Sequence, residues 1–454
     1  MKSVITCDME GVIETINDDG INLFGYSKDE LIGRKRVSLF SPGEIVIQNV
    51  GMWLSNAIKH GEYNTKSYFL SKEGKKINAR IRITPTFANG KNNPQTGYCG
   101  VTVPIEEEVI IPISITTKFI KWVFAITRGG FTSASLFPVF AVAAFLAGSG
   151  NGLFSPLLLL LCILGIVFLH LSSNLYNDYF DVKHGTDEAN TEYFNAGLNS
   201  KLLEGAQLSG GSRAIELGLI TLKGTKSLAR NMLIGAILTA SGLMYLSYSI
   251  TESMSNAQNA AIIGVIGLFL GYFYTAKPIR LVSRRGLGEI AIFLAFGPLL
   301  TLGSLFAIST STIELFSVDF YNAIYLGIPL GLLTTNILYI NQFPDANSDS
   351  KTGKNHLVVT LGKKIARWGY LIILLGAFLS SFMLLDIFSV TIENFNSNAY
   401  LIGLSILFLY GLYIFTRLFK LYESRKLINS NLNTIYLQII FGLFYALILN
   451  NFFI

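Results

Sequence analysis

Two short acidic motifs hold the residues of this chain that are best suited to chemistry. The first reads Asn-Leu-Tyr-Asn-Asp-Tyr-Phe-Asp and contains Asn174, Asn177, Asp178 and Asp181. On a helix, Asn174, Asp178 and Asp181 are spaced i, i+4 and i+7 and therefore share one face. Neighbouring carboxylates repel each other unless a cation joins them, and Mg²⁺ commonly bridges carboxylates to substrate phosphates. Taken alone, the motif is also compatible with a helix end that simply meets water.

The second motif contains Asp345 and Asp349, one helical turn apart, after Asn341. A second acidic pair changes the interpretation. Two pairs that reach the same side of a membrane can hold two metal ions around one diphosphate. The sequence therefore predicts that both pairs, Asp178 with Asp181 and Asp345 with Asp349, bind Mg²⁺ and act in catalysis.

Basic residues near these motifs complete a site for a polyanion. Arg213 lies in a glycine-rich turn, Leu-Ser-Gly-Gly-Ser-Arg, which can offer backbone N–H groups and a guanidinium to phosphate. Lys277 and Arg280 lie in the next basic loop, and Lys351 and Lys354 follow the second aspartate pair. Each charge alone is better explained as a topology signal, but together with four aspartates they indicate diphosphate binding. The predicted diphosphate-binding residues are Asn174, Asn177, Arg213, Lys277, Arg280, Asn341 and Lys351.

Long apolar stretches must position these motifs. The 454 residues are 51% hydrophobic and 14% charged, whereas soluble proteins carry about a quarter charged residues. Nine stretches are long and apolar enough to span a membrane, which requires about 20 residues. They are expected at 119–147, 153–177, 229–250, 258–275, 288–308, 322–342, 366–388, 398–417 and 433–453. The aspartate pairs fall at the ends of the second and the sixth.

The distribution of basic residues predicts the orientation in the membrane. Lys and Arg are concentrated in loops 181–230, 276–287 and 343–367 and after the eighth span, whereas the other four loops contain none. By the positive-inside rule, the basic loops and the N-terminus are cytoplasmic and the C-terminus is outside. The chain is therefore expected to be a multi-pass protein in the lipid bilayer of the cell inner (cytoplasmic) membrane, with both acidic motifs at the cytoplasmic face.

The residues before the first span are typical of a separate soluble domain. Strands are predicted at 66–70, 76–84 and 97–103, with a Lys-Glu-Gly-Lys turn between the first two. The segments DMEGVIETIN, LFGYSKDELIG, LSKEGKKINARIRITP and GYCGVTVPI resemble a PAS domain. The resemblance implies a curved antiparallel sheet with flanking helices, a small ligand of unknown identity and a regulatory role. We predict a small α+β, PAS-like cytoplasmic sensory domain at 1–108 and a linker at 109–118.

Residues 119–454 are expected to form an all-α polytopic membrane domain of nine transmembrane helices. Within it, NLYNDYFDVKHGTD, LSGGSRAIELGLIT, YFYTAKPIRLVSRRGLGEI, FGPLLTLGS and NQFPDANSDSKTGKNHLVVTLGKK resemble the UbiA superfamily of intramembrane aromatic prenyltransferases. By this resemblance the four aspartates match the two metal motifs, and Asn174 and Asn177 match flanking amides. Arg213 and Arg280 match positions that face the diphosphate. The stretch GKNHLVVTLG is similar to the branch that prenylates 1,4-dihydroxy-2-naphthoate in menaquinone synthesis.

The resemblance implies Mg²⁺-dependent transfer of a polyprenyl group from its diphosphate to an aromatic acceptor. The chain departs from the family at Gly185, where many relatives have a further acid, and at Pro344, where the naphthoate branch often has Arg. The acceptor therefore stays open among 1,4-dihydroxy-2-naphthoate and 4-hydroxybenzoate, haem, chlorophyll-type and lipid-ether alternatives. Two other classes are a PAS-linked membrane sensor without catalysis, which leaves the four aspartates unexplained, and a cation-coupled transporter. No nucleic-acid partner is expected.

Overall fold

A computed structural model describes residues 1–149, 154–185, 212 and 214–450. The chain divides into two compact units. The first consists of residues 1–127 with the described part of 187–222, and the second consists of the remaining described residues. A segment that lies between two of the apolar stretches in the sequence therefore groups with the N-terminal unit.

The N-terminal unit is built on an antiparallel sheet of five strands in the order β2-β1-β5-β4-β3. The strands are β1 (Ser3–Asp8), β2 (Ile13–Ile16), β3 (Tyr63–Leu70), β4 (Lys76–Thr86) and β5 (Gly97–Pro104). The predicted turn joins β3 to β4 and has Gly74 at φ 79°, a conformation that glycine adopts without steric cost. The three predicted strands and the α+β class of this domain are confirmed.

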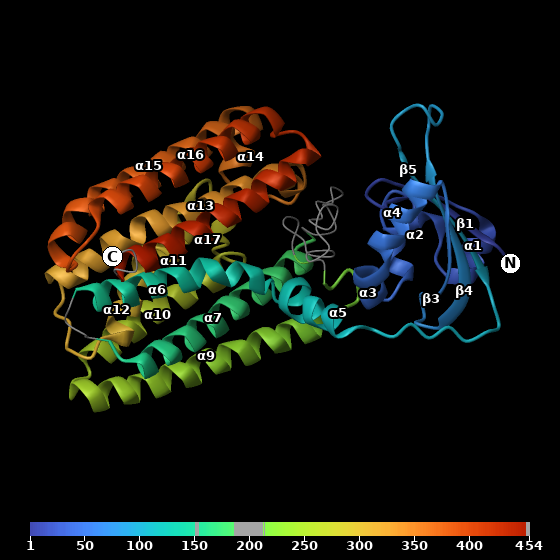
Figure 1. The fold of residues 1–454 in the computed structure, drawn as a ribbon. Helices are drawn as coiled ribbons and strands as arrows, with labels where there is room; N and C mark the ends of the chain where they lie inside the picture. The colour runs from blue at the N-terminus through green and yellow to red at the C-terminus, as the bar shows by residue number, and fades with distance from the viewer. Residues whose placement is uncertain (150–153, 186–211, 213, 451–454) are drawn as a thin grey trace. The chain divides into compact units, whose positions relative to one another are not determined.

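Short helices pack on the sheet (Figure 1). They are α1 (Asp18–Phe24), α2 (Lys28–Leu31), α3 (Gly43–Ile45) and α4 (Gly51–His60). Helix α5 (Ile115–Phe119) follows the last strand and lies away from the sheet (Figure 1). In the core, Phe24 stacks on Phe40 with ring centroids 4.1 Å apart, and Ile13 and Leu31 are fully buried. Burial of these apolar side chains is the main force that holds the unit together.

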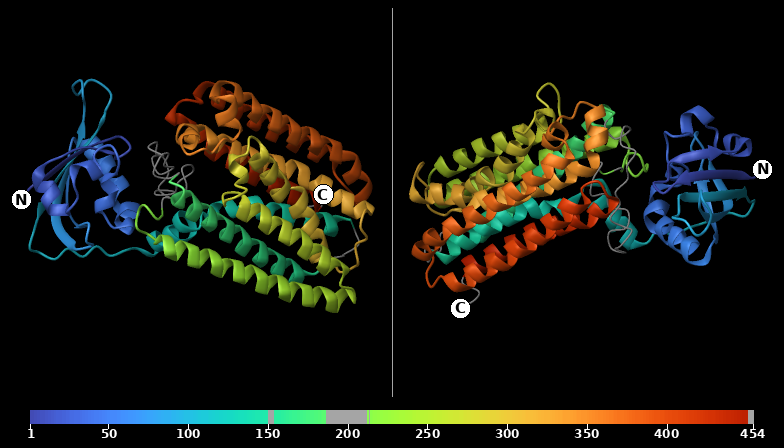
Figure 2. Two further views of the ribbon diagram at one scale, coloured as in Figure 1. Left: turned by 180° about the vertical axis from the view of Figure 1, so that it is seen from behind. Right: turned by 90° about the horizontal axis from the view of Figure 1, so that it is seen from above.

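The second unit contains nine segments that are long and apolar enough to cross a membrane, counted over the residues that the structure describes. The helices are α6 (Ser133–Gly148), α7 (Pro156–Lys183), α9 (Leu222–Thr251), α10 (Ser255–Phe273), α11 (Leu287–Phe296), α12 (Pro298–Ile308), α13 (Val318–Lys351), the short α14 (Leu357–Leu361), α15 (Lys363–Thr391), α16 (Ser397–Leu421) and α17 (Ile428–Leu449). The long helices lie alongside one another as a bundle (Figure 1, Figure 2). The predicted all-α domain of nine spans is confirmed.

Two of the predicted spans contain a break in the helix that the sequence did not indicate. The first begins at Gly129 rather than at position 119, because Ile115–Ile126 is helical within the N-terminal unit and Arg128, at φ 52°, interrupts the helix. The fifth consists of two helices, α11 and α12, that are separated at Gly297. Pro298 lacks the backbone N–H that a continuous helix would need. Hydropathy therefore located the spans but not these interruptions.

Helix α13 is packed against α11, α12, α15 and α17 and carries the second aspartate pair in its last turns (Figure 1). Asn336 Nδ2 donates a hydrogen bond to Tyr370 O of α15 at 3.2 Å. One turn further, the hydroxyl of Tyr339 donates to Ala366 O at 2.8 Å. These buried bonds fix the rotation of α13 about its axis, and thereby the direction in which Asp349 points.

Candidate active site

The last turns of α7 and α13 bring the two acidic motifs to one cation. Lys354 Nζ lies 3.1 Å from Asp181 Oδ2 and 3.8 Å from Asp349 Oδ1. None of these three side chains is more than 13% exposed. The backbone N–H of Lys354 donates to Asp349 O at 2.9 Å, so the turn after α13 folds the lysine back toward the aspartate. Residues far apart in the sequence thus meet in a single charged cluster.

The charge of Lys354 is set by its neighbours. Burial alone lowers the pKa of a lysine, but the carboxylates of Asp181 and Asp349 overcome this effect and hold the pKa of Lys354 above its usual value. The ammonium therefore stays charged and balances acids that would otherwise repel each other. Asp181 Oδ1 is buried and has no hydrogen-bond partner in the described part of the chain. One carboxylate oxygen is thus left for a further cation.

His356 orients Asp349 from another side. Its ring is 1% exposed, and Nε2 lies 3.1 Å from Asp349 Oδ2. Its Nδ1 accepts the backbone N–H of Val359 at 3.3 Å and so caps the N-terminus of α14. Because Nδ1 is an acceptor, the ring hydrogen is on Nε2 and is donated to the Asp349 carboxylate. One histidine therefore caps a helix and fixes a predicted metal ligand.

Arg280 supplies a guanidinium to this region. Its Nη1 donates to Thr352 O at 3.2 Å, in the same turn as Lys354. Its Nε and Nη2 are buried without a hydrogen-bond partner among the residues described. Burial first, and then the positive charges of Arg280 and Lys277, lower the pKa of His184 at the end of α7. Arg280 thus lies within electrostatic reach of both helix ends, and its unfilled donors are suited to an anion.

The other predicted charged residues differ in exposure. Asp178 is 4% exposed, and Asp345 is partly buried; each lies near the end of its helix. Lys351 is exposed, and Lys354 rather than Lys351 contacts the aspartates. Lys277, in the loop after α10, is also exposed. Arg213 lies outside the described residues, so the structure gives no position for it.

Two of the predicted amides connect an acidic motif to a neighbouring segment. Asn177 Oδ1 accepts a hydrogen bond from Thr275 Oγ1 at 2.8 Å. Asn341 Oδ1 accepts one from Asn431 Nδ2 of α17 at 2.7 Å. Both bonds cross between helices or their ends, so they hold the helix ends that carry the aspartates in place.

Asp181 and Asp349 bring carboxylate oxygens of both motifs to one place, and such oxygens are the ligand type that suits Mg²⁺. Within the described ranges, no group of three or more His, Cys, Asp and Glu side chains lies close enough to share a metal ion, and Lys354 stands where Asp181 and Asp349 meet. Asp181 Oδ1 has no hydrogen-bond partner among the described residues, and the ammonium of Lys354 is held by the carboxylates beside it. Both observations indicate that this cluster attracts positive charge. Hard oxygen donors fit Mg²⁺ better than a soft metal.

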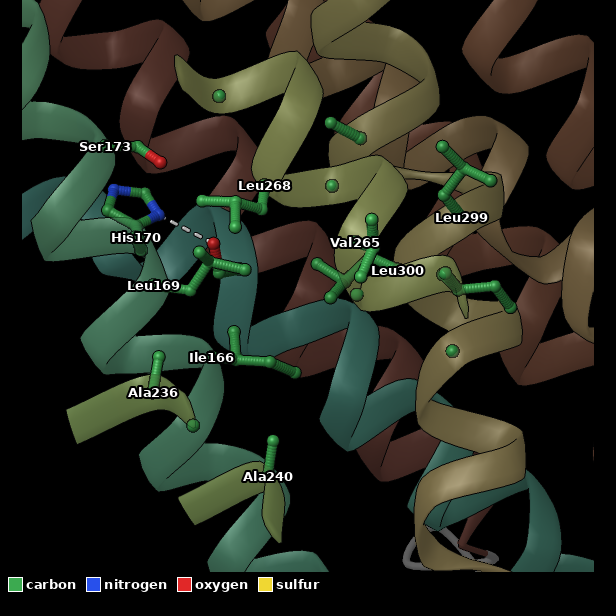
Figure 3. A pocket seen from close by; sticks show the side chains of 18 of the residues that line it. Ile166, Leu169, His170, Ser173, Ala236, Ala240, Val265, Leu268, Leu299 and Leu300 are labelled. Carbon is green, nitrogen blue, oxygen red and sulfur yellow. Dashed lines mark hydrogen bonds between the residues drawn. The ribbon is translucent and has the colours of Figure 1, made fainter. Parts of the chain in front are cut away.

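An apolar cavity of about 460 Å³ lies within the bundle beside the first motif. Residues of α7, α9, α10, α11 and α12 line it, among them Ile166, Leu268 and Leu299 (Figure 3). Asn174 and Asn177, which precede the first aspartate pair, also line it. The cavity is therefore suited to a hydrocarbon chain whose polar end reaches the aspartates.

The predicted site residues did not include Glu289, Tyr274 or His356, and Lys354 was predicted only as one of several basic residues near the site. Glu289 of α11 is 5% exposed, and its Oε1 accepts from Gln342 Nε2 at 2.9 Å. The hydroxyl of Tyr274 is buried without a partner in the described part of the chain, and Tyr274 lines the cavity. Lys354 and His356 contact Asp349 directly. All four lie in the segments GLGEI, YFYTAKPIR and GKNHLVV, whose family resemblance was the available signal.

Comparison with known families gives two matches. The UbiA prenyltransferase family matches residues 135–435, which include both acidic motifs and the cavity. A PAS domain matches residues 2–101, which hold the five-stranded sheet almost completely. The two matches fall on the two parts of the chain that were predicted separately from the sequence.

Similar proteins were found among curated sequences and solved structures. A 1,4-dihydroxy-2-naphthoate octaprenyltransferase of Haemophilus influenzae is 30% identical over 228 residues, covering 49% of this chain and 65% of that protein, just under two thirds of its length. The UbiA prenyltransferase domain-containing protein 1 of Rattus norvegicus is 26% identical over 262 residues, covering 58% of this chain and 67% of that protein. A match to the structure of a UbiA homolog from Archaeoglobus fulgidus bound to GPP and Mg²⁺ covers 73% of this chain and 99% of the homolog's chain. The sequence identity is 15% and the TM-score is 0.48.

Proposed function

Because this chain belongs to the UbiA prenyltransferase family and carries an N-terminal PAS domain, we propose that it transfers a polyprenyl group from its diphosphate to an aromatic acceptor. The observation that carries the proposal is the meeting of Asp181 and Asp349 at Lys354, with Arg280 and an apolar cavity nearby. Carboxylates and a guanidinium suit a metal-bound diphosphate, and the cavity suits the attached hydrocarbon.

Magnesium is the metal that this donor set fits. Asp178, Asp181, Asp345 and Asp349 would hold it, and when bound it neutralises the diphosphate and makes it a better leaving group. Lys354 pairs with two of these carboxylates in the structure and supplies a further positive charge at the same place. A diphosphate entering the site therefore meets more than one cation.

The residues of the chain bind and orient the substrates. Arg280 has two buried donor atoms, Nε and Nη2, without a partner among the described residues, and they can bind diphosphate oxygens. The cavity takes the prenyl chain and excludes water, which favours attack by the acceptor ring on the prenyl C1 over hydrolysis. Stabilisation of developing charge in a dry site is usually the largest contribution to catalysis.

We propose 1,4-dihydroxy-2-naphthoate as the acceptor, which would place the reaction in menaquinone biosynthesis. The support is the 30% identity to an octaprenyltransferase named for this acceptor. A second group of relatives, named UbiA prenyltransferase domain-containing protein 1, is 26% identical over a similar length. A different aromatic acceptor is therefore the second candidate.

We propose that the protein lies in the cell inner membrane, with its N-terminus and both acidic motifs on the cytoplasmic side and its C-terminus outside. The support is the concentration of Lys and Arg in loops 181–230, 276–287 and 343–367. In this orientation a soluble acceptor reaches the aspartates from the cytoplasm, and the prenyl chain reaches the cavity from the bilayer.

We also propose that the PAS domain, predicted at 1–108, binds a small ligand and regulates the transfer. The support is that the segment leading into α9 packs on this domain. Arg36 Nη1 lies 3.1 Å from Glu216 Oε1. Gly43 lies so close to Leu217 O and Leu219 that a Cβ at Gly43 would clash with them. A change in the PAS domain can therefore reach a segment that is continuous with a helix of the cavity wall.

A product assay tests the proposed reaction. Purified protein is incubated with geranylgeranyl diphosphate, 1,4-dihydroxy-2-naphthoate and Mg²⁺, and mass spectrometry detects prenylated product and released diphosphate. We expect product that disappears with EDTA and in Asp178→Ala but persists in Asp319→Ala, because Asp319 is an exposed residue in the first turn of α13. A parallel reaction with 4-hydroxybenzoate identifies the preferred acceptor. No product with either acceptor from folded protein would contradict the proposal.

A further inference from the structure

A buried histidine faces the apolar cavity, and one of its ring nitrogens has no partner in the described part of the chain. His170 lies in α7, about two turns before Asp178, and is 8% exposed. Its Nδ1 is hydrogen-bonded to Ser135 Oγ of α6 at 2.6 Å (Figure 3). Its Nε2 is buried and has no hydrogen-bond partner among the described residues. The ring also packs edge-on against Phe296, with centroids 5.6 Å apart, so its orientation is fixed on two sides.

The unpaired nitrogen needs a partner that a prenyl chain cannot provide. Buried polar groups in native proteins are nearly always hydrogen-bonded, so an exception that lines a cavity indicates a ligand or a water molecule. A prenyl chain is a hydrocarbon and offers neither a donor nor an acceptor. The partner of His170 Nε2 is therefore a polar atom that the described residues do not supply.

Other polar residues on α7 connect His170 to the aspartates. Asn174 and Asn177 follow His170 at i+4 and i+7, and all three line the cavity. The cavity wall around them is mainly apolar, as the neighbouring Ile166 and Leu169 illustrate (Figure 3). A row of polar groups inside an apolar cavity suits a ligand that carries polar substituents on an apolar ring.

We propose that His170 Nε2 accepts a hydrogen bond from a ring hydroxyl of the aromatic acceptor. The proposal rests on the prenyl transfer proposed above and names a residue that selects and positions the acceptor. The neutral imidazole donates Nδ1–H to Ser135 Oγ, which keeps the lone pair on Nε2 for the substrate hydroxyl. Accepting that hydrogen polarises the O–H bond and raises the electron density of the ring that attacks C1. His170 thus makes the site specific for hydroxylated aromatics.

One kinetic assay with paired substrates tests this role. Wild type, His170→Leu and His170→Gln are assayed with 1,4-dihydroxy-2-naphthoate and with each of its two monomethyl ethers. The KM for the acceptor and the KM for the prenyl diphosphate are measured separately, and thermal unfolding verifies that each variant is folded. Ser172→Ala is the matched control, because Ser172 lies on the same helix and donates a buried hydrogen bond to Ala229 O at 2.9 Å, but is not one of the residues that line the cavity.

We expect His170→Leu to raise the KM for the acceptor roughly tenfold, which corresponds to one lost hydrogen bond. The KM for the prenyl diphosphate should not change, and Ser172→Ala should leave both KM values as in wild type. One of the two monomethyl ethers should show a similar loss with wild type but no additional loss with His170→Leu, because the two changes remove the same bond. His170→Gln retains a polar end group and should restore part of the loss.

Equal effects of methylation on wild type and His170→Leu would overturn the proposal. So would an increase of both KM values by the same factor, which is what a histidine bound only to water and structure would produce. In either case, product formation by wild type would still support the proposed transfer reaction. Absence of product from folded wild type with every acceptor would overturn the transfer reaction and this proposal together.

Discussion

Lys354 joins two acidic groups that would otherwise repel each other. Lys354→Ala leaves Asp181 and Asp349 buried without their shared ammonium. We expect it to destabilise the metal-free protein by roughly 3–5 kcal/mol, the typical effect of removing one partner of a buried ion pair. Mg²⁺ should recover most of this loss, because a divalent ion replaces the missing charge. Thermal unfolding in EDTA and in Mg²⁺ measures both effects.

Lys351→Ala is the control for this experiment. Lys351 lies three positions earlier and is exposed, so its removal should change the free energy of unfolding little. Equal destabilisation by the two variants, or a loss in Lys354→Ala that Mg²⁺ does not reverse, would contradict the assigned role of Lys354.

His184, at the end of α7, makes stability depend on pH. Burial, followed by the charges of Arg280 and Lys277, lowers its pKa in the folded protein below the usual value of about 6.5. The unfolded state therefore binds the proton first as the pH falls. The contribution of His184 to stability is thus present above about pH 6.5 and is lost as the pH falls below it.

His184→Asn should remove this part of the pH dependence. Unfolding measured between about pH 7.5 and 5.5 should show a smaller decrease in stability for the variant than for wild type. The same decrease in both proteins would mean that other groups cause the acid sensitivity.

The acidic residues could be predicted from the sequence, but which of the nearby lysines lies between them could not. Helical spacing and the charge of the loops predicted both aspartate pairs at one face, and in the structure Asp181 and Asp349 meet at Lys354. The choice of Lys354 over Lys351 depends on the turn after α13, where Gly353 has φ 70° and the chain returns toward Asp349. Residue spacing does not determine such a turn. The unpaired nitrogen of His170 likewise becomes visible only when the cavity is known.

At the scale of elements, α11 and α13 approach each other closely through glycines. A Cβ at Gly331 of α13 would lie 2.9 Å from the Cα of Gly297 and 2.5 Å from Phe293 O. Small residues allow helices in membranes to pack backbone against backbone. The same approach holds Glu289 of α11 within 2.9 Å of Gln342 of α13. Close packing of these helices therefore positions buried polar groups near the second motif.

Gly331→Ala should separate α11 from α13, because the added methyl group meets backbone atoms that cannot move aside. We expect a loss of about 1–3 kcal/mol in stability, as for other overpacked sites, and reduced transfer activity. Gly242→Ala in α9 is the control, since a Cβ there meets nothing within 4 Å and alanine favours a helix. Thermal unfolding and the product assay distinguish the two, and equal stability of both variants would contradict this packing.

Apolar length predicted the membrane-spanning elements well, and backbone breaks explain where it was inaccurate. The segment Ile120–Ile126 is mainly apolar and was therefore predicted as part of the first span. It belongs to the N-terminal unit, because the helix is interrupted at Arg128. Within the fifth span, Gly297 and Pro298 divide the helix although both neighbouring segments are apolar. A hydropathy window counts apolar side chains and does not register such changes in the backbone.

At the scale of the whole molecule, the N-terminal unit includes part of the loop between α7 and α9. Arg36 is 8% exposed, donates through Nε to Glu10 O at 3.2 Å and pairs through Nη1 with Glu216. Arg36 and Glu216 are separated by 180 positions, so no local pattern indicates their contact. Composition and resemblance were sufficient to predict a PAS domain before a membrane domain, but not this attachment.

Arg36→Ala should release the loop segment from the PAS domain. We expect faster hydrogen exchange at residues 214–219 and a changed rate of prenyl transfer, because the segment continues into α9, which lines the cavity. Arg34→Ala is the matched control, since Arg34 is exposed and lies two positions earlier. Hydrogen exchange followed by mass spectrometry is the measurement. Unchanged exchange at 214–219 in Arg36→Ala would contradict the attachment.

The claim that the two acidic motifs form one site can be tested directly by calorimetry. Binding of a prenyl diphosphate with Mg²⁺ is measured for wild type, Asp181→Asn, Asp349→Asn and the double variant. If both carboxylates serve one metal-bound diphosphate, each single change should weaken binding strongly, and the double variant should be little weaker than either. Losses in binding free energy that simply add, or wild-type affinity in either single variant, would contradict a shared site.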